Sequence, residues 1–324
     1  QVIDMSVLKV VVHSVDNELE TVILSDRQIN LSQNVELDDY ILKFFVAFKK
    51  SSAKSFGLLN EDSFLNGLIG TRDFEFMNVS KDIARAWFDT YETSHTYTSC
   101  NLIFALVETE ESLEYAMFEV MGKSGYLKVV DDDSTNEIKH SMGILSDRFS
   151  SVKTAFSFDL GSGDLVVKTH KDSEEKLESI LDFKTIPNAR KSLEIVDAVV
   201  DELSSRRDDD ILENRLKSNQ ILLADAELFE EIEPKRIVEQ VFDSLEEEEI
   251  DYLNETIEST LLPNIIDSSA VNRLTSRKKH RIKTEFGIEV VLPLDSVDID
   301  SVLEVETGAD GRVNIVLKNV GSIE

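Results

Sequence analysis

A change in hydrophobic periodicity divides this chain and most constrains the fold that it can adopt. Between Cys100 and His170, apolar residues occur in short, partly alternating runs separated by turn-forming residues, which is typical of antiparallel strands. From residue 173 to residue 262, apolar residues instead recur every three or four positions, which predicts helices. Strand-like runs return after that. We therefore predict an α+β chain with an N-terminal mixed domain containing an antiparallel sheet at 1–172, a helical middle region at 173–262 and a small β-rich C-terminal domain at 263–324.

The N-terminal domain is expected to begin with a β-hairpin. Val7–His13 and Leu19–Leu24 are rich in β-branched and aliphatic residues, and the turn-forming pair Asp16-Asn17 lies between them. Apolar residues at helical spacing then predict helices over 40–48 and 83–91. Ser80 is a candidate N-cap of the second helix.

Three apolar stripes predict the helices of the middle region. They run through Leu193–Leu203, Ile237–Leu245 and Ile250–Leu261, with Pro234 near the first turn of the second. Residues 173–262 include 26 acidic and 10 basic residues, which gives a formal charge of 10 − 26 = −16. The solvent-facing surfaces of these helices are therefore expected to be acidic.

The C-terminal domain is expected to consist of strands. Gly287–Pro293 predicts one strand, and residues 302–306 and 313–318 predict a hairpin around the turn sequence Gly308-Ala309-Asp310-Gly311.

The whole chain is strongly acidic, with 34 Lys and Arg against 64 Asp and Glu and a formal charge of 34 − 64 = −30. Because 41% of the residues are hydrophobic, the chain can still bury an ordinary core, which excludes a disordered acidic chain. Its one cysteine, Cys100, cannot close an intramolecular disulfide, and no secretory leader or membrane span is readable. We expect a cytoplasmic protein that does not insert into a membrane.

One cluster of six basic residues without an acid lies between the helical region and the C-terminal strands. Its members are Arg273, Arg277, Lys278, Lys279, Arg281 and Lys283. Such a cluster can neutralise phosphates and release condensed counterions, which gives sequence-independent affinity for nucleic acid. In a chain of charge −30, the same segment can instead dock on the acidic helices. The sequence does not decide between these two readings.

A smaller basic site precedes the first helix of the middle region, where Lys184 is followed by Arg190 and Lys191. Free backbone N–H groups at a helix N-terminus favour anions, so these cations could share a phosphate with the helix end. Solvated side chains at a helix start are the plainer interpretation.

No catalytic or metal site is readable. Acidic runs such as Asp131-Asp132-Asp133 lack the ligand spacing of a calcium loop, and the five histidines lack the spacing of metal ligands. No phosphate-binding loop is present, and Gly161-Ser162-Gly163 is interpreted as a hairpin turn. A nuclease-like pairing of Asp164 or Asp182 with Lys168 or Lys184 is of the kind that occurs by chance in any charged chain. We expect no enzymatic activity, no metal and no cofactor.

Three stretches together resemble a known family. They are Phe56-Gly57-Leu58-Leu59-Asn60-Glu61-Asp62-Ser63-Phe64-Leu65, the helix start Asn188-Ala189-Arg190-Lys191, and Gly287-Ile288-Glu289-Val290-Val291-Leu292-Pro293 followed by the Gly-Ala-Asp-Gly turn. In order and spacing they are similar to the bacterial nucleoid-associated proteins of the NdpA type over nearly the whole chain. The resemblance implies a cytoplasmic, nucleoid-localised protein that associates with DNA without a known reaction, and Arg190 and Lys191 match the family's basic helix start.

Two functions from different classes remain open. The chain either binds duplex DNA through a local basic patch, or is an acidic interaction or DNA-mimic protein whose helices engage basic or DNA-binding partners. A duplex repels acidic faces within a Debye length of about 8 Å at physiological salt, so any direct DNA binding has to be local. No residue decides whether the protein serves in defence against foreign DNA, and the sequence leaves a homo-oligomer open.

Overall fold

The computed structural model describes residues 5–16, 19–94, 99–130, 136–170, 173–274, 279–283, 287–293, 303–307 and 313–318. The chain divides into two compact units, Gln1–Thr185 and Ile186–Glu324. Among the residues described, no helix is both long and apolar enough to cross a membrane.

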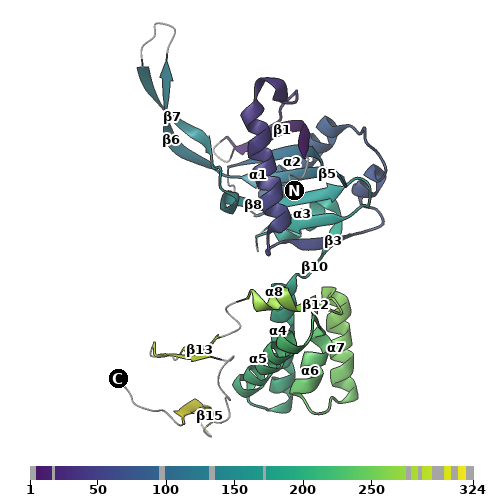
Figure 1. Ribbon diagram of the computed structural model, residues 1–324, viewed down its shortest axis with the longest axis vertical. Coiled ribbons are helices and arrows are strands. Elements are labelled where there is room, and N and C mark those ends of the chain that lie inside the picture. The colour runs from purple at the N-terminus through teal and green to yellow at the C-terminus, as the bar shows by residue number, and fades with distance from the viewer. Residues whose placement is uncertain are drawn as a thin grey trace. The chain divides into compact units, whose positions relative to one another are not determined.

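An eight-stranded sheet forms the centre of the first unit (Figure 1). The strand order is β10-β3-β9-β8-β5-β4-β1-β2, and the registered pairs from β3 to β2 are all antiparallel. The strands are β1 (Ser6–Asp16), β2 (Thr21–Ile23), β3 (Ser55–Leu59), β4 (Cys100–Glu108), β5 (Leu113–Val120), β8 (Val152–Asp159), β9 (Leu165–Lys168) and β10 (Phe183–Ile186).

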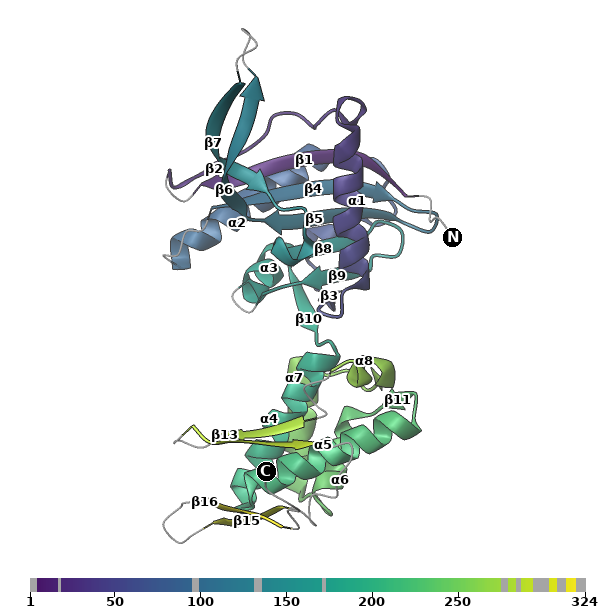
Figure 2. The same ribbon diagram turned by 60° about the vertical axis from the view of Figure 1, so that its left-hand side comes forward.

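Helices cover both faces of this sheet (Figure 2). Helix α1 (Val35–Lys50) packs on one face, and α2 (Phe76–Ser94) with α3 (Glu174–Leu181) packs on the other. Successive residues of β5 join the two opposite cores, since Tyr115 packs with α2 whereas Ala116 packs with α1. Burial on both faces explains why the central strands are nearly continuous apolar runs. Among its described residues, the unit also has three short 3₁₀ helices: η1 (Leu31–Gln33), η2 (Phe64–Leu68) and η3 (Phe149–Ser151).

A separate two-stranded antiparallel ribbon belongs to the same unit. It consists of β6 (Gly122–Val130) and β7 (Asn136–Leu145), which form their own sheet. In both ribbon views it extends beyond the edge of the layers formed by the main sheet and its helices (Figures 1 and 2).

The second unit is built on helices with one shared core. They are α4 (Ala189–Arg207), α5 (Ile211–Leu228), α6 (Pro234–Val241), α7 (Glu247–Thr260) and α8 (Ser268–Asn272), with a small pair of strands, β11 (Glu231–Ile232) and β12 (Ile266–Asp267). The predicted apolar stripes supply the core, in which Val200, Leu203, Ile237 and Leu253 are almost fully buried. Ile250 is a member of the third stripe but is exposed.

Two further hairpins follow the helices. Strand β13 (Lys279–Lys283) pairs with β14 (Glu289–Pro293), and β15 (Leu303–Thr307) pairs with β16 (Val313–Leu317). The predicted fold class, α+β with an antiparallel N-terminal sheet, a helical middle and C-terminal strands, is confirmed. The predicted division into three domains stays a prediction.

The predicted N-cap at Ser80 is wrong. Helix α2 already begins at Phe76, so Ser80 lies inside the helix and is fully buried. Its hydroxyl is 3.0 Å from Nε2 of His13 and donates to the carbonyl of Met77. Ser80 therefore satisfies a buried histidine of the neighbouring strand instead of starting a helix.

Candidate nucleic-acid interface

The six-residue basic cluster is described in part. Arg273 is exposed at the C-cap of α8, and Lys279, Arg281 and Lys283 occupy alternate positions of β13. Their register partners on β14 are Pro293, Val291 and Glu289. Arg277 and Lys278 lie outside the described residues.

The smaller basic site is described more completely. Lys184 is exposed on β10, and Asn188 is the N-cap of α4, where its side chain accepts a hydrogen bond of 3.1 Å from the backbone N–H of Lys191. Arg190 is exposed, and the first turn of α4 has no acidic residue. Neither Lys184 nor Arg190 forms an ion pair with another residue that the structure describes.

Three described arginines of the helical unit, Arg206, Arg207 and Arg215, are held by carboxylates. Arg207 donates to Glu249 over 2.6 Å and to the carbonyl of Ser244, while its guanidinium lies 4.8 Å from the centre of the Phe242 ring. Glu249 is 8% exposed, and the hydrogen bond from Arg207 lowers the pKa of its carboxyl group. Arg215 forms two hydrogen bonds to Asp201. These guanidinium groups stabilise the helix packing and are engaged before any ligand arrives.

Helix α7 presents an acidic surface. It contains no basic residue, and its exposed carboxylates belong to Glu247, Glu248, Asp251, Glu255 and Glu258. The N-terminal end of the helix tolerates this charge because acids near a helix start interact favourably with the helix dipole. A capping box between Glu246 and Glu249 fixes that end. The prediction of acidic helix surfaces holds on this helix.

The longest family-like stretch has a structural role. Gly57 lies where a Cβ atom would come within 2.6 Å of Leu165 and 2.7 Å of Phe183, so these two side chains pack over it. Asn60 donates from Nδ2 to Asp182 over 2.7 Å, and the hydroxyl of the buried Ser63 donates to the carbonyl of Leu181 over 2.6 Å. The stretch ties β3 to the turn between α3 and β10, where Asp182 has a positive φ of 53°.

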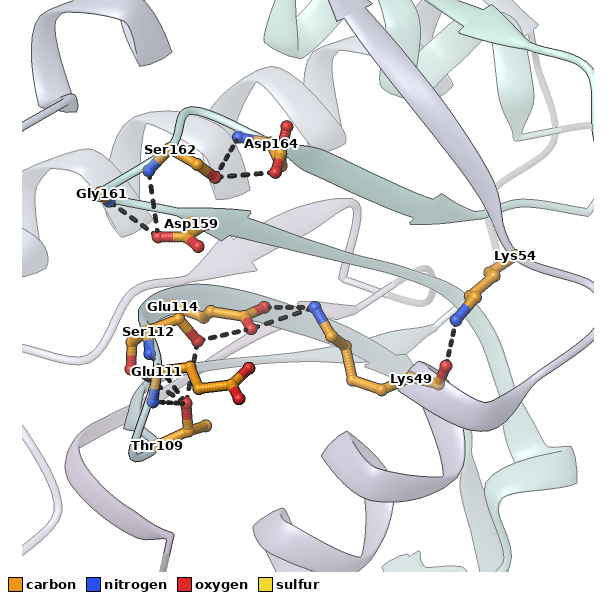
Figure 3. A network of polar contacts seen from close by, with 10 residues as sticks. All are labelled: Lys49, Lys54, Thr109, Glu111, Ser112, Glu114, Asp159, Gly161, Ser162 and Asp164. Carbon is orange, nitrogen blue, oxygen red and sulfur yellow. Dashed lines mark hydrogen bonds and ion pairs between the residues drawn. The ribbon is translucent and has the colours of Figure 1, made fainter. Parts of the chain in front are cut away.

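A cleft of about 630 Å³ lies beside two turns of the first unit. Its walls come from 70–72, 108–113 and 159–162, and the side chains there serve the turns themselves (Figure 3). Thr109 bonds to Ser112, and the Asp159 carboxylate accepts from the N–H of Gly161 over 2.7 Å. Behind the first turn, buried Glu114 forms an ion pair of 2.8 Å with Lys49. The hydroxyls of Ser112 and Ser162 donate to the carboxylates of Glu114 and Asp164, so the polar side chains of the cleft serve the two turns.

Three of the four residues in the nuclease-like pairing, Asp164, Asp182 and Lys168, have structural partners, whereas Lys184 is exposed. Asp164 accepts from the hydroxyl of Ser162 in the hairpin turn between β8 and β9, which confirms that Gly161-Ser162-Gly163 belongs to a turn. Asp182 bonds to Asn60, and Lys168 donates to the carbonyls of Val152 and Lys153. Within the described part of the chain, no group of three His, Cys, Asp or Glu is placed to hold a metal ion.

Lys176, a partly buried lysine whose side-chain nitrogen is fully buried, was not identified from the sequence. Nζ of Lys176 on α3 lies 3.9 Å from the centre of the Trp87 ring on α2, and burial lowers its pKa to about 8. Lysine is polar and gives no periodic signal, so only the packing of α3 on α2 reveals it.

Comparison with known proteins gives one family. The family model described as nucleoid-associated protein YejK matches residues 11–323, so the match runs through both compact units. No curated protein matches the chain significantly. The resemblance indicated by the three sequence stretches is confirmed.

Proposed function

The chain belongs to the family of the nucleoid-associated protein YejK, and we propose that it serves in the bacterial nucleoid by binding duplex DNA through local basic patches. The cations concerned are Lys184 on β10 of the first unit, Arg190 and Lys191 at the α4 start of the second unit, and the segment from Arg273 to Lys283. The binding is independent of base sequence, because cations that neutralise phosphates carry no base-specific information.

The observation that carries this proposal is the difference between engaged and available cations. Arg207 and Arg215 are held by Glu249 and Asp201, whereas exposed Arg190 has no ion-pair partner among the described residues and no acid in the first turn of its helix. Free N–H groups of that turn add to the local attraction for a phosphate. Salt screens the interaction between exposed charges beyond about 8 Å. Acidic surfaces farther away than this therefore do little to repel a phosphate bound at these cations.

A titration of duplex DNA at several salt concentrations tests the proposal. The six cations of the Arg273–Lys283 segment contribute at most about −5 to the slope of log K against log salt, from about −0.9 for each neutralised phosphate. Changing Arg277, Lys278, Lys279 and Arg281 to Ala is expected to flatten the slope by up to about 4, and changing Arg190 and Lys191 to Ala by up to about 2.

The matched control is Arg215→Ala, which removes an arginine already held by Asp201. This variant is expected to lower stability and to leave the slope unchanged. If the segment docks on the acidic helices instead, its variant will melt at a lower temperature with undiminished DNA affinity. That outcome, or equal slopes for the Arg190 variant and the wild type, contradicts direct binding at the site concerned.

We propose further that the chain performs no reaction of its own on DNA. In the described structure Asp164, Asp182 and Lys168 are engaged in turn and strand contacts. Magnesium-dependent cleavage of plasmid by pure protein, abolished by Asp164→Asn or Asp182→Asn, would refute this.

A second candidate function rests on the acidic surface of α7, which has no cation of its own. Such a surface suits a basic or DNA-binding protein partner, since complementary charge steers association. Changing Asp251, Glu255 and Glu258 to their amides leaves the helix start intact and is expected to slow association with such a partner. The control changes Asp39, Glu61 and Asp62, three exposed acids of the first unit, to their amides. Equal loss of binding in both variants would show that net charge alone, and not α7, attracts the partner.

A further inference from the structure

One face of the β6–β7 ribbon is open to solvent and rich in apolar side chains. Residues that pair across antiparallel strands point to the same face, so the register assigns six exposed side chains to it. They are Tyr126, Lys128, Val130, Asn136, Ile138 and His140. Tyr126 is 74% exposed and Ile138 is 76% exposed. We call this surface the Tyr126 face, and its exposed apolar area indicates a binding partner.

The Tyr126 face contains no acidic residue, although the whole chain carries a formal charge of −30. The one acid among the described residues of the two strands is Glu137, which pairs with Val129 on the opposite face. There it forms an ion pair of 3.0 Å with Lys139. Because an exposed carboxylate would repel a phosphate, the acid-free face is the side of the ribbon that suits a nucleic acid.

The charge of the ribbon favours unpaired bases over a duplex. Residues 122–145 contain three lysines and four acids, so their formal charge is 3 − 4 = −1. The ribbon therefore cannot supply the many phosphate contacts that dominate binding to a duplex. Unpaired bases instead gain affinity by stacking on aromatic side chains, which requires an exposed ring more than a cluster of cations.

Two aromatic rings on this face are held in place by the ribbon itself. The ring centres of Tyr126 and His140 are 5.3 Å apart, and the ring planes are inclined by 62°. Nε2 of His140 lies 2.9 Å from the hydroxyl oxygen of Ser124. These contacts orient the rings before a ligand arrives, which lowers the entropic cost of binding. Ile138 extends the apolar surface beside them, and Lys128 is its register partner on β6.

We infer that the Tyr126 face binds single-stranded DNA, with an unpaired base stacked on Tyr126 and a neighbouring phosphate at Lys128. DNA is the occupant because the chain belongs to a nucleoid-associated family. The inference rests on the proposed function only in taking DNA as the ligand. It goes beyond that function, since it concerns a different surface and a different form of DNA.

Fluorescence anisotropy of a labelled oligo-dT of about 12 nucleotides, titrated with the full chain, tests the inference. The wild type is expected to bind it. Tyr126→Ala is expected to raise the Kd about fivefold to about a hundredfold, which is the usual cost of one lost stacking contact. The factor should be the same at low and at high salt, because salt does not screen stacking. Tyr126→Phe keeps the ring and is expected to bind like the wild type.

The lysine of the face gives a second measurement that does not depend on the Tyr126 substitution. Lys128→Ala removes an exposed side chain and is expected to flatten the slope of log K against log salt by about 0.7, the value for one phosphate of a single strand. Leu127 and Lys139 provide matched controls, since they pair with each other on the opposite face and are both exposed. Leu127→Ala and Lys139→Ala are expected to leave oligo-dT binding unchanged.

Four outcomes would overturn the inference. They are a wild type that does not bind oligo-dT, equal losses for Tyr126→Ala and Leu127→Ala, equal losses of oligo-dT and duplex affinity in Tyr126→Ala, and tighter binding of an oligo-U of the same length. The third outcome would remove the preference for unpaired bases, and the fourth would assign the face to RNA. A chain that binds oligo-dT through Tyr126 but binds no duplex would refute the proposed function alone.

Discussion

The buried histidine of β1 makes the stability of the first unit depend on pH. Nδ1 of His13 accepts a hydrogen bond of 3.1 Å from the backbone N–H of Ser25. The hydroxyl of Ser80 donates to the carbonyl of Met77, so it accepts from Nε2–H of His13. The neutral ring with its proton on Nε2 therefore satisfies every partner. A second proton on Nδ1 would face the N–H of Ser25, a donor that cannot accept it.

The magnitude follows from the pKa of this group. Burial, with smaller contributions from Lys81 and Arg85, lowers the pKa of His13 from 6.5 to about 4. Between these values the unfolded chain binds a proton that the native protein rejects, so the stability that neutral His13 contributes is fully present above pH 6.5 and is lost as pH falls toward 4. The loss amounts to about 2 kcal/mol between about pH 7.5 and about pH 5.

Urea unfolding of the wild type and of His13→Gln at both pH values measures this loss. The variant is expected to be less stable near pH 7.5, since it loses packing against Phe104, but its stability should fall by about 2 kcal/mol less on acidification. His140→Gln, which removes an exposed histidine of the ribbon, controls for the loss of a histidine as such. Equal acid-dependent losses in the wild type and His13→Gln would refute the reasoning, because other groups would then account for the whole effect.

Two further substitutions test the packing that positions the proposed interfaces. Arg207→Ala leaves the buried Glu249 carboxylate without its cation and is expected to cost about 3 kcal/mol in urea unfolding, whereas Arg206→Ala, whose ion pair is exposed, is expected to cost less than about 1 kcal/mol. Similar costs for the two arginines would contradict the assigned burial. Gly57→Ala places a Cβ against two packed side chains and is expected to cost about 1 to 3 kcal/mol, while Gly67→Ala, whose Cβ meets nothing within 4 Å, should cost much less by the same measurement.

The sequence predicted those elements whose burial produces a period. The stripes of α4 and α6, and the strands that became β1 and β4, each bury a regular set of apolar residues, so spacing alone identifies them. The prediction that Ser80 is an N-cap was wrong because hydroxyl residues favour both helix caps and other local hydrogen bonds. The hydrogen-bond partner of Ser80 on β1, His13, lies 67 positions away in the sequence. Lys176 and Gly57 were not assigned roles for the same reason, since their neighbours come from other elements.

Candidate binding residues are harder to read, because a sequence gives the sign of a charge but not its partner. Lys184, Arg190 and Lys191 were found as a local run of cations, and Arg207 and Arg215 are equally basic in the sequence. Only the folded chain separates them, since Glu249 lies 42 positions from Arg207 and Asp201 lies 14 positions from Arg215. The roles of the segment from Arg273 to Lys283 stay a prediction.

The formal charge of −30 on this chain would prevent association with DNA only if every charged residue acted on every phosphate. Screening limits an exposed charge to about 8 Å at physiological salt, so a phosphate responds to the cations and acids within that distance. Arg207 and Arg215 are already neutralised by their partners, whereas Arg190 stands at a helix start without acids, and α7 collects acids without cations. Separate surfaces of one acidic chain can therefore attract a phosphate and a basic protein. Substitution of Arg190 should therefore lower DNA affinity with little effect on stability. Substitution of Arg207 should lower stability with little effect on DNA affinity. Neither substitution should alter binding of a basic partner to α7.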